Sequence, residues 1–483
     1  MKKLLYTLGM NYAMIEYANC RRIYFWIMKI GGELKVITRD RNFYKLILAI
    51  ALPIACQNLI TFAVSMADSV MIGRLGEIPL SAVSLANQLF FIFMIFIFGL
   101  GSGGNILIAQ YWGKGDTQAI HKIISIMYKA GVIFTLLFML IGAVFPQTFM
   151  SAFSKDAQVV ALGTQYLQII FISFIFFALT NITINVLRSV QTVKISLVVY
   201  SVSLAVNIFL NWVLIFGNLG APAMGVRGAA IATTIARLCE FLIAIGFMLF
   251  VEKKIQFKIK CLLKTDSLLL KDFVIVGGPV LLNELIWALG STALAFIVAK
   301  LGTEVVAATS INNVVWQFVA IFIMGVGHAG AVIIGNTIGA AEYIKAQEYA
   351  NTLIMGAVIL GLAGGLVMFG IRPYVLMLYK ISDTTRAITM QIIAVSSGIL
   401  VFQSLAFTLM IGILRGGGDT RFVLITDVIF LWLVAIPLGY IAAVVFKLPI
   451  PVVFIILKCD EAIKVIVSLF RVKSGKWIKN VTR

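Results

Sequence analysis

The stretch PIACQNLITFAVSMADSVMIGRLG, residues 53–76, opens a segment that occurs twice in this chain. Residues 53–116 align without a gap on residues 279–342, shifted by 226 positions, and about 18 of the 64 positions are identical where chance would give roughly one in ten. The matched positions include a proline, an asparagine and a series of glycines: Pro53, Gly76, Asn87, Gly99, Gly101, Gly104 and Gly113 meet Pro279, Gly302, Asn313, Gly325, Gly327, Gly330 and Gly339. Repeated helical units of this kind are typical of carriers whose substrate site lies between the repeats.

The composition places the chain in a lipid bilayer. Hydrophobic residues make up 61% of the 483 residues and charged residues 12%, against roughly half and a quarter in soluble domains. Apolar stretches long enough to cross a hydrocarbon core of about 30 Å lie at 45–71, 79–104, 119–145, 160–183, 191–215, 228–251, 271–299, 305–332, 347–370, 388–412, 421–446 and 449–470. The sequence therefore predicts an all-α polytopic membrane protein with twelve transmembrane helices in two pseudo-symmetric six-helix bundles.

The distribution of Lys and Arg predicts the orientation. With both termini inside, the inner segments hold about 27 Lys and Arg and the outer loops about 8, as the positive-inside rule requires. We expect a multi-pass protein of the inner (plasma) membrane with a cytoplasmic tail at 1–40, an N-terminal lobe at 41–251, a basic cytoplasmic linker at 252–271, a C-terminal lobe at 272–472 and a basic tail at 473–483. Residues 1–33 lack the pattern of a signal peptide, and translation from Met28 is the alternative to a long tail.

Several function classes are disfavoured by what the sequence lacks. It has no GxxxxGK[ST] phosphate loop, so ATP is not expected to be the direct energy source. Its two histidines, His121 and His328, have no second ligand at metal spacing, so neither an enzyme nor a cofactor is expected. The net charge is +19, and the basic residues lie in short tracts beside helix ends. Anionic lipid head groups rather than nucleic acid are the expected partners of such tracts. The cysteines are expected to be unpaired fillers: Cys20, Cys56, Cys239, Cys261 and Cys459.

Acidic residues inside the apolar stretches carry the most information, because a carboxylate at the bilayer centre costs about 2.5–3.5 kcal/mol and is usually kept for function. Glu240 follows Arg237 by three residues, so a local ion pair is expected. Asp460 and Glu461 lie within helical reach of Lys458 and Lys464, and we expect these four to pair structurally. Asp427 has only Arg421, a turn and a half away, and its role stays open.

Asp68 differs, because its own span offers no basic partner except Arg74 beyond the end. Asn207 and Asn211 lie one turn apart and so project from one helix face, and Thr233 lies in the next span. One carboxylate with amide and hydroxyl oxygens could hold a hard cation such as Na⁺, and a buried carboxylate can equally carry a proton. A hydrogen-bonded packing cluster is the alternative.

A substrate cavity is expected around Glu284. The repeat alignment matches Asn283 with Gln57 and Glu284 with Asn58. Each lobe is therefore expected to have a polar pair at the same depth in the membrane. Glu284 has no basic neighbour in its own helix and lies near aromatic residues, as suits a site for organic cations. The other expected cavity residues are Asn87, Trp287, Asn313 and Gln317, with helix–helix hydrogen bonding as the alternative for the asparagines.

The segments LPIACQNLITFAVSMADSVMIGRLG, NIFLNWVLIFG, GVRGAAIATTIAR, ILRGGGDTR and KSGKWIK together resemble the multidrug and toxic compound extrusion (MATE) transporters over about residues 38–480. The resemblance implies a V-shaped fold of two six-helix lobes that exports organic cations in exchange for Na⁺ or H⁺ by alternating access. It also implies that the coupling acid of the first span falls on Asp68, with partners at Asn207, Asn211 and Thr233. A monomer with small organic cations as substrates is expected.

Two positions depart from that pattern. Many members have Asp where this chain has Asn211, so the cluster carries one negative charge, which a single Na⁺ or H⁺ would neutralise. One branch has an acid in the tenth span where this chain has Ser404, so a cation site in the C-terminal lobe would rest mainly on Glu284. A flippase for lipid-linked oligosaccharides, which would need a more cationic cavity, and a membrane receptor or channel subunit remain the alternatives.

Overall fold

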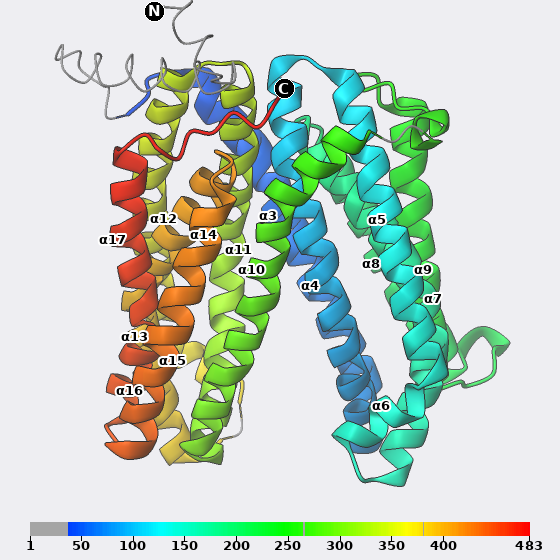
Figure 1. Ribbon diagram of the computed structural model, residues 1–483. Coiled ribbons are helices and arrows are strands. Elements are labelled where there is room, and N and C mark those ends of the chain that lie inside the picture. Colours follow the sequence, from blue (N-terminus) through cyan, green and yellow to red (C-terminus); the bar gives the residue numbers. More distant parts are fainter. Residues whose placement is uncertain (1–36, 264–265, 380) are drawn as a thin grey trace, which may run out of the picture.

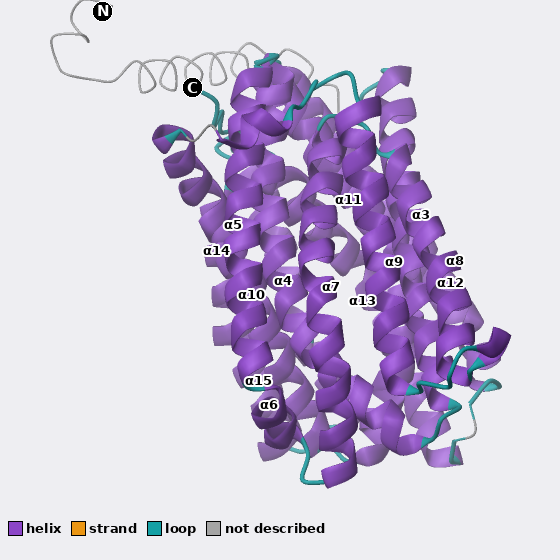
Figure 2. Ribbon diagram, turned by 90° about the vertical axis from the view of Figure 1, so that its right-hand side faces the viewer, coloured by secondary structure: helices purple, strands orange, loops and turns teal. Residues whose placement is uncertain are grey.

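The computed structural model describes residues 37–263, 266–379 and 381–483, and all regular secondary structure in these ranges is helical (Figure 2). Most of the expected tail at 1–40, with Cys20 and Met28, lies outside the described residues. The other four cysteines are free thiols, as expected.

Six long helices form the N-terminal lobe. They are α3 (Arg41–Gly73), α4 (Glu77–Lys114), α5 (Thr117–Val144), α7 (Ala157–Ser189), α8 (Lys194–Phe216) and α9 (Val226–Gly246), with the short α6 (Pro146–Phe153) after α5 and a π-helical end at Phe247–Val251. Several helices begin directly after a polar N-cap residue, because its side-chain oxygen can accept a hydrogen bond from a free backbone N–H group of the first turn. At the start of α5, for example, Asp116 accepts from the backbone N–H of Ala119.

The C-terminal lobe repeats the arrangement. It contains α10 (Ser267–Lys300), α11 (Thr303–Gly339), α12 (Tyr343–Leu376), α13 (Asp383–Phe407) with its π-helical end η4 (Thr408–Arg415), α14 (Thr420–Val428) continued by η5 (Ile429–Ala435), α15 (Ile436–Tyr440) and η6 (Ile441–Val445), and finally α16 (Ile450–Leu457) and α17 (Cys459–Lys473). Because α10 begins at Ser267, the last residues of the expected linker are helical.

Eleven of the helical segments in the described ranges are long and apolar enough to cross a membrane. The twelfth expected span is broken at Lys458 into α16 and α17, since this stretch carries several charged side chains. The predicted two-bundle, twelve-span architecture is confirmed, with the last span in two pieces.

The first helix of each lobe begins against the other lobe (Figure 1). At the start of α3, the Thr38 N–H donates to Thr352 Oγ1 at 2.9 Å, and the Phe43 ring stacks on Tyr349 of α12 with centroids 4.3 Å apart. Before α10, Lys122 of α5 forms a 2.9 Å ion pair with Asp266. From this shared end, which we call the tail face because residues 474–483 lie there, the lobes diverge toward the opposite end, the far face (Figure 1).

Glycines let the lobes meet near the tail face. A Cβ atom added at Gly113 of α4 would lie 1.9 Å from the backbone oxygen of Asn336, and one added at Gly339 of α11 would lie 1.9 Å from that of Gln110. Gly113 and Gly339 are repeat equivalents, and so are Gln110 and Asn336. The two contacts are therefore related by the pseudo-two-fold symmetry of the lobes. Only glycine, which has no side chain, fits at these two positions.

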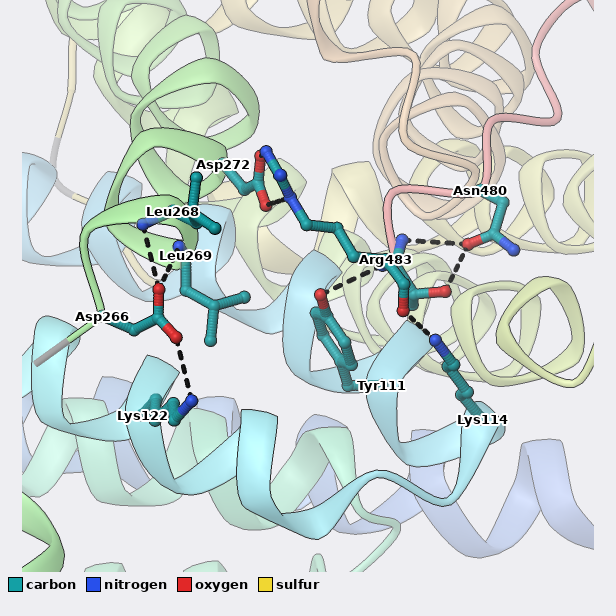
Figure 3. A network of polar contacts seen from close by, with 10 residues as sticks. Tyr111, Lys114, Lys122, Asp266, Leu268, Leu269, Asp272, Asn480 and Arg483 are labelled. Atoms are coloured by element: carbon teal, nitrogen blue, oxygen red, sulfur yellow. Dashed lines mark hydrogen bonds and ion pairs between the residues drawn. The ribbon is translucent and has the colours of Figure 1, made fainter. Parts of the chain in front are cut away.

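Residues 474–483 form a strap across both lobes at the tail face. Trp477 is fully buried in the C-terminal lobe, and its Nε1 donates to Gln347 at 3.0 Å. Farther along, the Val481 N–H donates to Gln110 Oε1 of α4 at 2.8 Å. The Arg483 guanidinium then binds Asp272 of α10 through two hydrogen bonds, of 2.6 and 2.8 Å (Figure 3).

Figure 3 also shows the neighbouring start of α10, where Asp266 accepts from the backbone N–H groups of Leu268 and Leu269. The hydrogen bond from Lys122, together with these backbone donors, holds the pKa of Asp266 below its usual value. The tail face is thus held by ion pairs from the helix ends of both lobes.

We expect Trp477→Ala to destabilise the protein by about 3–5 kcal/mol, because it empties a fully buried site of indole size and leaves Gln347 without its donor. Thermal unfolding in detergent measures the loss. Trp212→Ala is the matched control, since that ring is 43% exposed. Equal losses in the two variants would contradict a buried anchor at Trp477.

Candidate functional site

The structure brings the four expected cation-coupling residues together. Asn211 of α8 donates from Nδ2 to Asp68 Oδ1 of α3 at 2.5 Å and to Asn207 Oδ1 at 3.2 Å, and Asn207 Nδ2 lies 3.4 Å from Thr233 Oγ1 of α9. Asn207 and Asn211 are buried while Asp68 is partly exposed. Three helices therefore converge on one carboxylate, as the one-turn spacing of the asparagines predicts.

This cluster contains a buried oxygen without a partner. Asn211 Oδ1 makes no hydrogen bond to any described residue, although buried amide oxygens normally accept one. With the Asp68 carboxylate, Asn207 Oδ1 and Thr233 Oγ1, it provides the uncharged and anionic oxygen ligands that hard cations prefer. The residues present fit a monovalent cation.

Next to the cluster, the expected local ion pair is confirmed. Arg237 Nη1 lies 3.0 Å from Glu240 Oε2, and Ser203 of α8 donates to Glu240 Oε1 at 2.5 Å. The Arg237 guanidinium also stacks over the Phe177 ring, 4.9 Å from its centroid. Glu240 is fully engaged by these neighbours, whereas among the described residues Asp68 accepts its hydrogen bond from the uncharged Asn211 amide and forms no ion pair.

Glu284 is not unpaired, and that expectation is wrong. Arg415 of η4 binds Glu284 Oε1 at 2.6 Å through Nη1 and Asn283 Oδ1 at 2.8 Å through Nη2. The arginine arrives from a span 131 residues away, so inspection of α10 alone gives no sign of it. Ser404, at the position where one branch has an acid, donates to the Ala357 backbone oxygen at 2.8 Å and joins two helices.

Asp427 finds its partners across the bundle. Its carboxylate lies 2.8 Å from Lys464 Nζ of α17 and accepts from Asn283 Nδ2 at 2.7 Å, so Arg421 is not its partner. Lys464 also pairs with Asp460 at 2.8 Å, as its i,i+4 spacing predicts. Glu461 makes no ion pair with a described residue, contrary to the expectation for it. The cluster Asp460–Lys464–Asp427–Asn283–Arg415–Glu284 thus runs through four helical spans of the C-terminal lobe.

We expect Lys464→Ala to cost about 3–5 kcal/mol, because it leaves the buried Asp460 and the half-buried Asp427 without their shared cation. The shift in thermal unfolding in detergent measures this loss, and the exposed Lys473→Ala is the control. Removing Asp427 as well, in Asp427→Asn/Lys464→Ala, should restore part of the stability. An unchanged unfolding temperature for Lys464→Ala would exclude a structural role for the shared lysine.

The remaining expected cavity residues fall into two groups. Gln57 is buried, and its Oε1 accepts from Arg188 at 3.3 Å. Asn87, Asn313, Trp287 and Gln317 are exposed and make no hydrogen bond to a described residue. The alternative of helix–helix hydrogen bonding therefore does not describe Asn87 and Asn313.

Two residues that bind the expected cavity side chains were not predicted from the sequence: Arg188 and Arg415. Arg188 ends α7 and Arg415 ends η4, and each binds the repeat-equivalent residue of its lobe, Gln57 and Asn283 respectively. The signal is present in the sequence as VLRS at 186–189 and ILRG at 413–416. It was missed because these arginines lie beyond the aligned segments.

The MatE family model matches the chain twice, at residues 53–213 and 279–441. A probable multidrug resistance protein NorM from Thermotoga maritima is 25% identical over 453 residues, which covers 90% of this chain and 93% of that protein. A protein of the same name from Rhizobium meliloti is 28% identical over 427 residues, covering 83% of this chain and 86% of that protein.

Solved structures show the same fold. A MOP superfamily transporter from Pyrococcus furiosus matches with a TM-score of 0.82 at 19% identity, over 92% of this chain and 99% of that chain. A multidrug resistance MATE family transporter described as outward-facing matches with the same TM-score and identity, over 91% and 99%. The chain therefore belongs to the MatE family and is, by homology, a multi-pass membrane protein of the MATE multidrug efflux transporters.

Proposed function

We propose that the protein exports small organic cations by antiport with Na⁺ or H⁺, and that Asp68 is the coupling group. The observation that supports this proposal is the cluster of Asp68 with Asn211, Asn207 and Thr233, in which one buried amide oxygen has no partner among the residues that the structure describes. A single carboxylate takes one monovalent charge, so we propose one ion bound per cycle at this cluster.

The Asn211 amide can serve both states of the site. Without an ion, its Nδ2 donates to the Asp68 carboxylate. Rotation of the amide would turn Oδ1 toward a bound Na⁺, and protonation of Asp68 would let the carboxyl group donate to Oδ1 instead. Either ligand would change the link between α3 and α8.

Helix α3 connects this cluster to the lobe interface. Its far end carries Asp68, Pro53 interrupts its interior, and its first turns pack against α12 of the other lobe. An interior proline frees a backbone carbonyl and weakens the helix locally. We propose that ion binding alters the bend of α3, and so gives ion and substrate different affinities in the two packings of the lobes.

Substrate cations would bind between the diverging halves of the lobes. The exposed indole of Trp287 can attract a cation through its ring face, and the exposed amides of Asn87, Asn313 and Gln317 can accept hydrogen bonds from it. Glu284 already neutralises Arg415, so it would contribute to cation recognition only when that ion pair opens. A cofactor is not part of this proposal.

We further propose that the tail face lies in the cytoplasm of the cell, that both termini are inside and that the membrane is the plasma membrane. The basic linker segment 252–263 and the strap lie at this face (Figure 1), and the positive-inside rule retains such basic segments in the cytoplasm. The far face would then be external, and the protein would act as a monomer.

Everted membrane vesicles test the function. A Na⁺ or proton gradient directed out of the vesicle lumen should drive accumulation of ethidium by the wild-type protein, with one of the two ions effective. The absence of gradient-driven accumulation across a broad panel of organic cations, with the protein present in the membrane, would contradict multidrug antiport and favour a flippase or receptor.

A further inference from the structure

The strap passes between two separate hydrophobic clusters at the tail face. The first, which we call the C-lobe cluster, is built mainly from α11, α12, η4 and the start of α3, and it contains Trp477 with Ile478 packed against it. The second, the N-lobe cluster, is built mainly from α4, α5 and the start of α10, and Val481 packs against it. The strap therefore crosses from one cluster to the other within residues 478–481.

The attachment of the strap to the C-lobe cluster is buried. Trp477 is fully buried and donates from Nε1 to Gln347 at 3.0 Å. The Lys479 N–H donates to the Gly417 backbone oxygen at 2.9 Å, and Lys479 Nζ lies 2.5 Å from the buried carboxylate of Asp419. Detachment here would expose an indole ring and take a cation away from a buried acid, so this attachment is the fixed end of the strap.

Gln110 of α4 holds the strap at the crossing point. Its fully buried side chain donates from Nε2 to the Lys479 backbone oxygen at 3.1 Å, and its Oε1 accepts from the Val481 N–H at 2.8 Å. The amide thus pairs with the strap backbone through one donor and one acceptor. Besides the packing of Val481, two hydrogen bonds make this contact.

The last residue of the strap is held by contacts that solvent reaches (Figure 3). The Arg483 N–H donates to the Tyr111 hydroxyl at 3.2 Å, its backbone oxygen accepts from Lys114 Nζ, and its guanidinium pairs with Asp272 of α10 at 2.6 Å. The Arg483 side chain is 52% exposed. Exposed ion pairs and single hydrogen bonds contribute little net free energy, because water replaces each partner. The attachment to the N-lobe cluster can therefore open at low cost.

The pseudo-symmetry of the lobes does not extend to the strap. Asn336 is the repeat equivalent of Gln110, and its buried side-chain amide has no hydrogen-bond partner in the part of the chain that the structure describes. Among these residues, the strap contact is thus made on one side of the pseudo-two-fold axis. The glycine contacts, in contrast, are made on both sides. The strap is an additional, single tie across an otherwise symmetric interface.

We propose that the strap is a latch for the tail face. Its attachment at Gln110 and Asp272 opens whenever the lobes separate at this face, while Trp477 stays in the C-lobe cluster. The latch rests on the proposed transport by alternating access and adds a release step to it. Because the latch contacts exist only while the lobes are together, they favour the packing seen here, and weakening them shifts the equilibrium toward the tail-open packing.

Reversible cross-linking tests whether the latch must open. In a variant without the native cysteines, Arg483→Cys and Asp272→Cys are joined by a short bis-methanethiosulfonate reagent, which a reductant removes. Export of ethidium in everted vesicles should fall at least tenfold on cross-linking and return on reduction. Asn480→Cys with Tyr343→Cys is the matched control, because Asn480 Nδ2 lies 3.4 Å from the Tyr343 hydroxyl of α12. This second cross-link ties the strap to the C-lobe cluster and should leave export unchanged. Unchanged export with the first cross-link complete would overturn the latch.

Spin-label distances test the latch without transport. Labels at Thr482→Cys and Lys271→Cys span the releasable attachment, and labels at Lys476→Cys and Lys345→Cys span the fixed one. Asp272→Asn removes the exposed ion pair, so the fraction of molecules with a long distance in the first pair should rise about fivefold. The second pair should keep its distance.

The two readouts separate the latch from the transport function. An unchanged first pair in Asp272→Asn, or an equal lengthening of the second pair, would overturn the latch, since the strap would then stay closed or detach as a whole. If the reduced protein moves no organic cation while the first pair responds as expected, the latch stands and the proposed transport function fails.

Discussion

Asp68→Asn is expected to reduce gradient-driven export strongly while leaving the protein inserted and able to bind substrate. The asparagine keeps the shape of the side chain, and its oxygen can still accept from Asn211, which donates to Asp68 at 2.5 Å. The charge that attracts Na⁺ or H⁺ is lost. Export in everted vesicles should fall about 5–150-fold, the range that corresponds to a coupling free energy of about 1–3 kcal/mol.

Glu304→Gln is the matched control for this prediction, because Glu304 is an exposed acid in the first turn of α11. That variant should export as wild type does. Substrate binding measured without a gradient separates loss of coupling from loss of recognition. Export at the wild-type rate by Asp68→Asn, with the same ion dependence, would move the search for the coupling group to Asp427 or Glu284.

Local spacing predicted the contacts that lie within one helix or between neighbouring helices. The Arg237–Glu240 pair follows from a spacing of three residues, and the Asp460–Lys464 pair from a spacing of four. The fold also followed from the sequence, because the length of each apolar stretch fixes a span and the repeat fixes the two lobes. The break at Lys458 and the start of α10 within the expected linker were not anticipated.

Contacts between distant spans could not be predicted in this way. Arg415 and Glu284 are 131 residues apart, and no helical periodicity relates α10 to η4. Lys464 was assigned to its local partner Asp460, but it also binds Asp427 of another helix. Glu284 was consequently expected to be free for a substrate cation, whereas it is paired with Arg415.

The tail-face contact between lobes provides the second large effect. Gly113→Ala would place a methyl carbon 1.9 Å from the Asn336 oxygen, well inside the 3.0 Å that real Cβ atoms respect, and the obstructing atom belongs to the backbone of a buried helix. The lobes must separate there to relieve the clash. Gly339→Ala creates the same clash with the Gln110 oxygen, so we expect the two variants to behave alike.

Overpacking of this kind costs about 1–3 kcal/mol, which shifts a two-state equilibrium about 5–150-fold away from the packing seen here. Spin labels at Lys253→Cys and Lys345→Cys, on a background without the native cysteines, report the distance between the lobes at the tail face. Both variants should lengthen that distance and slow export. Gly356→Ala is the control, since a Cβ there meets no atom within 4 Å. If the distance between the spin labels is unchanged in Gly113→Ala and Gly339→Ala, the clash is relieved within one lobe. The glycine contacts would then not control the separation of the lobes at the tail face.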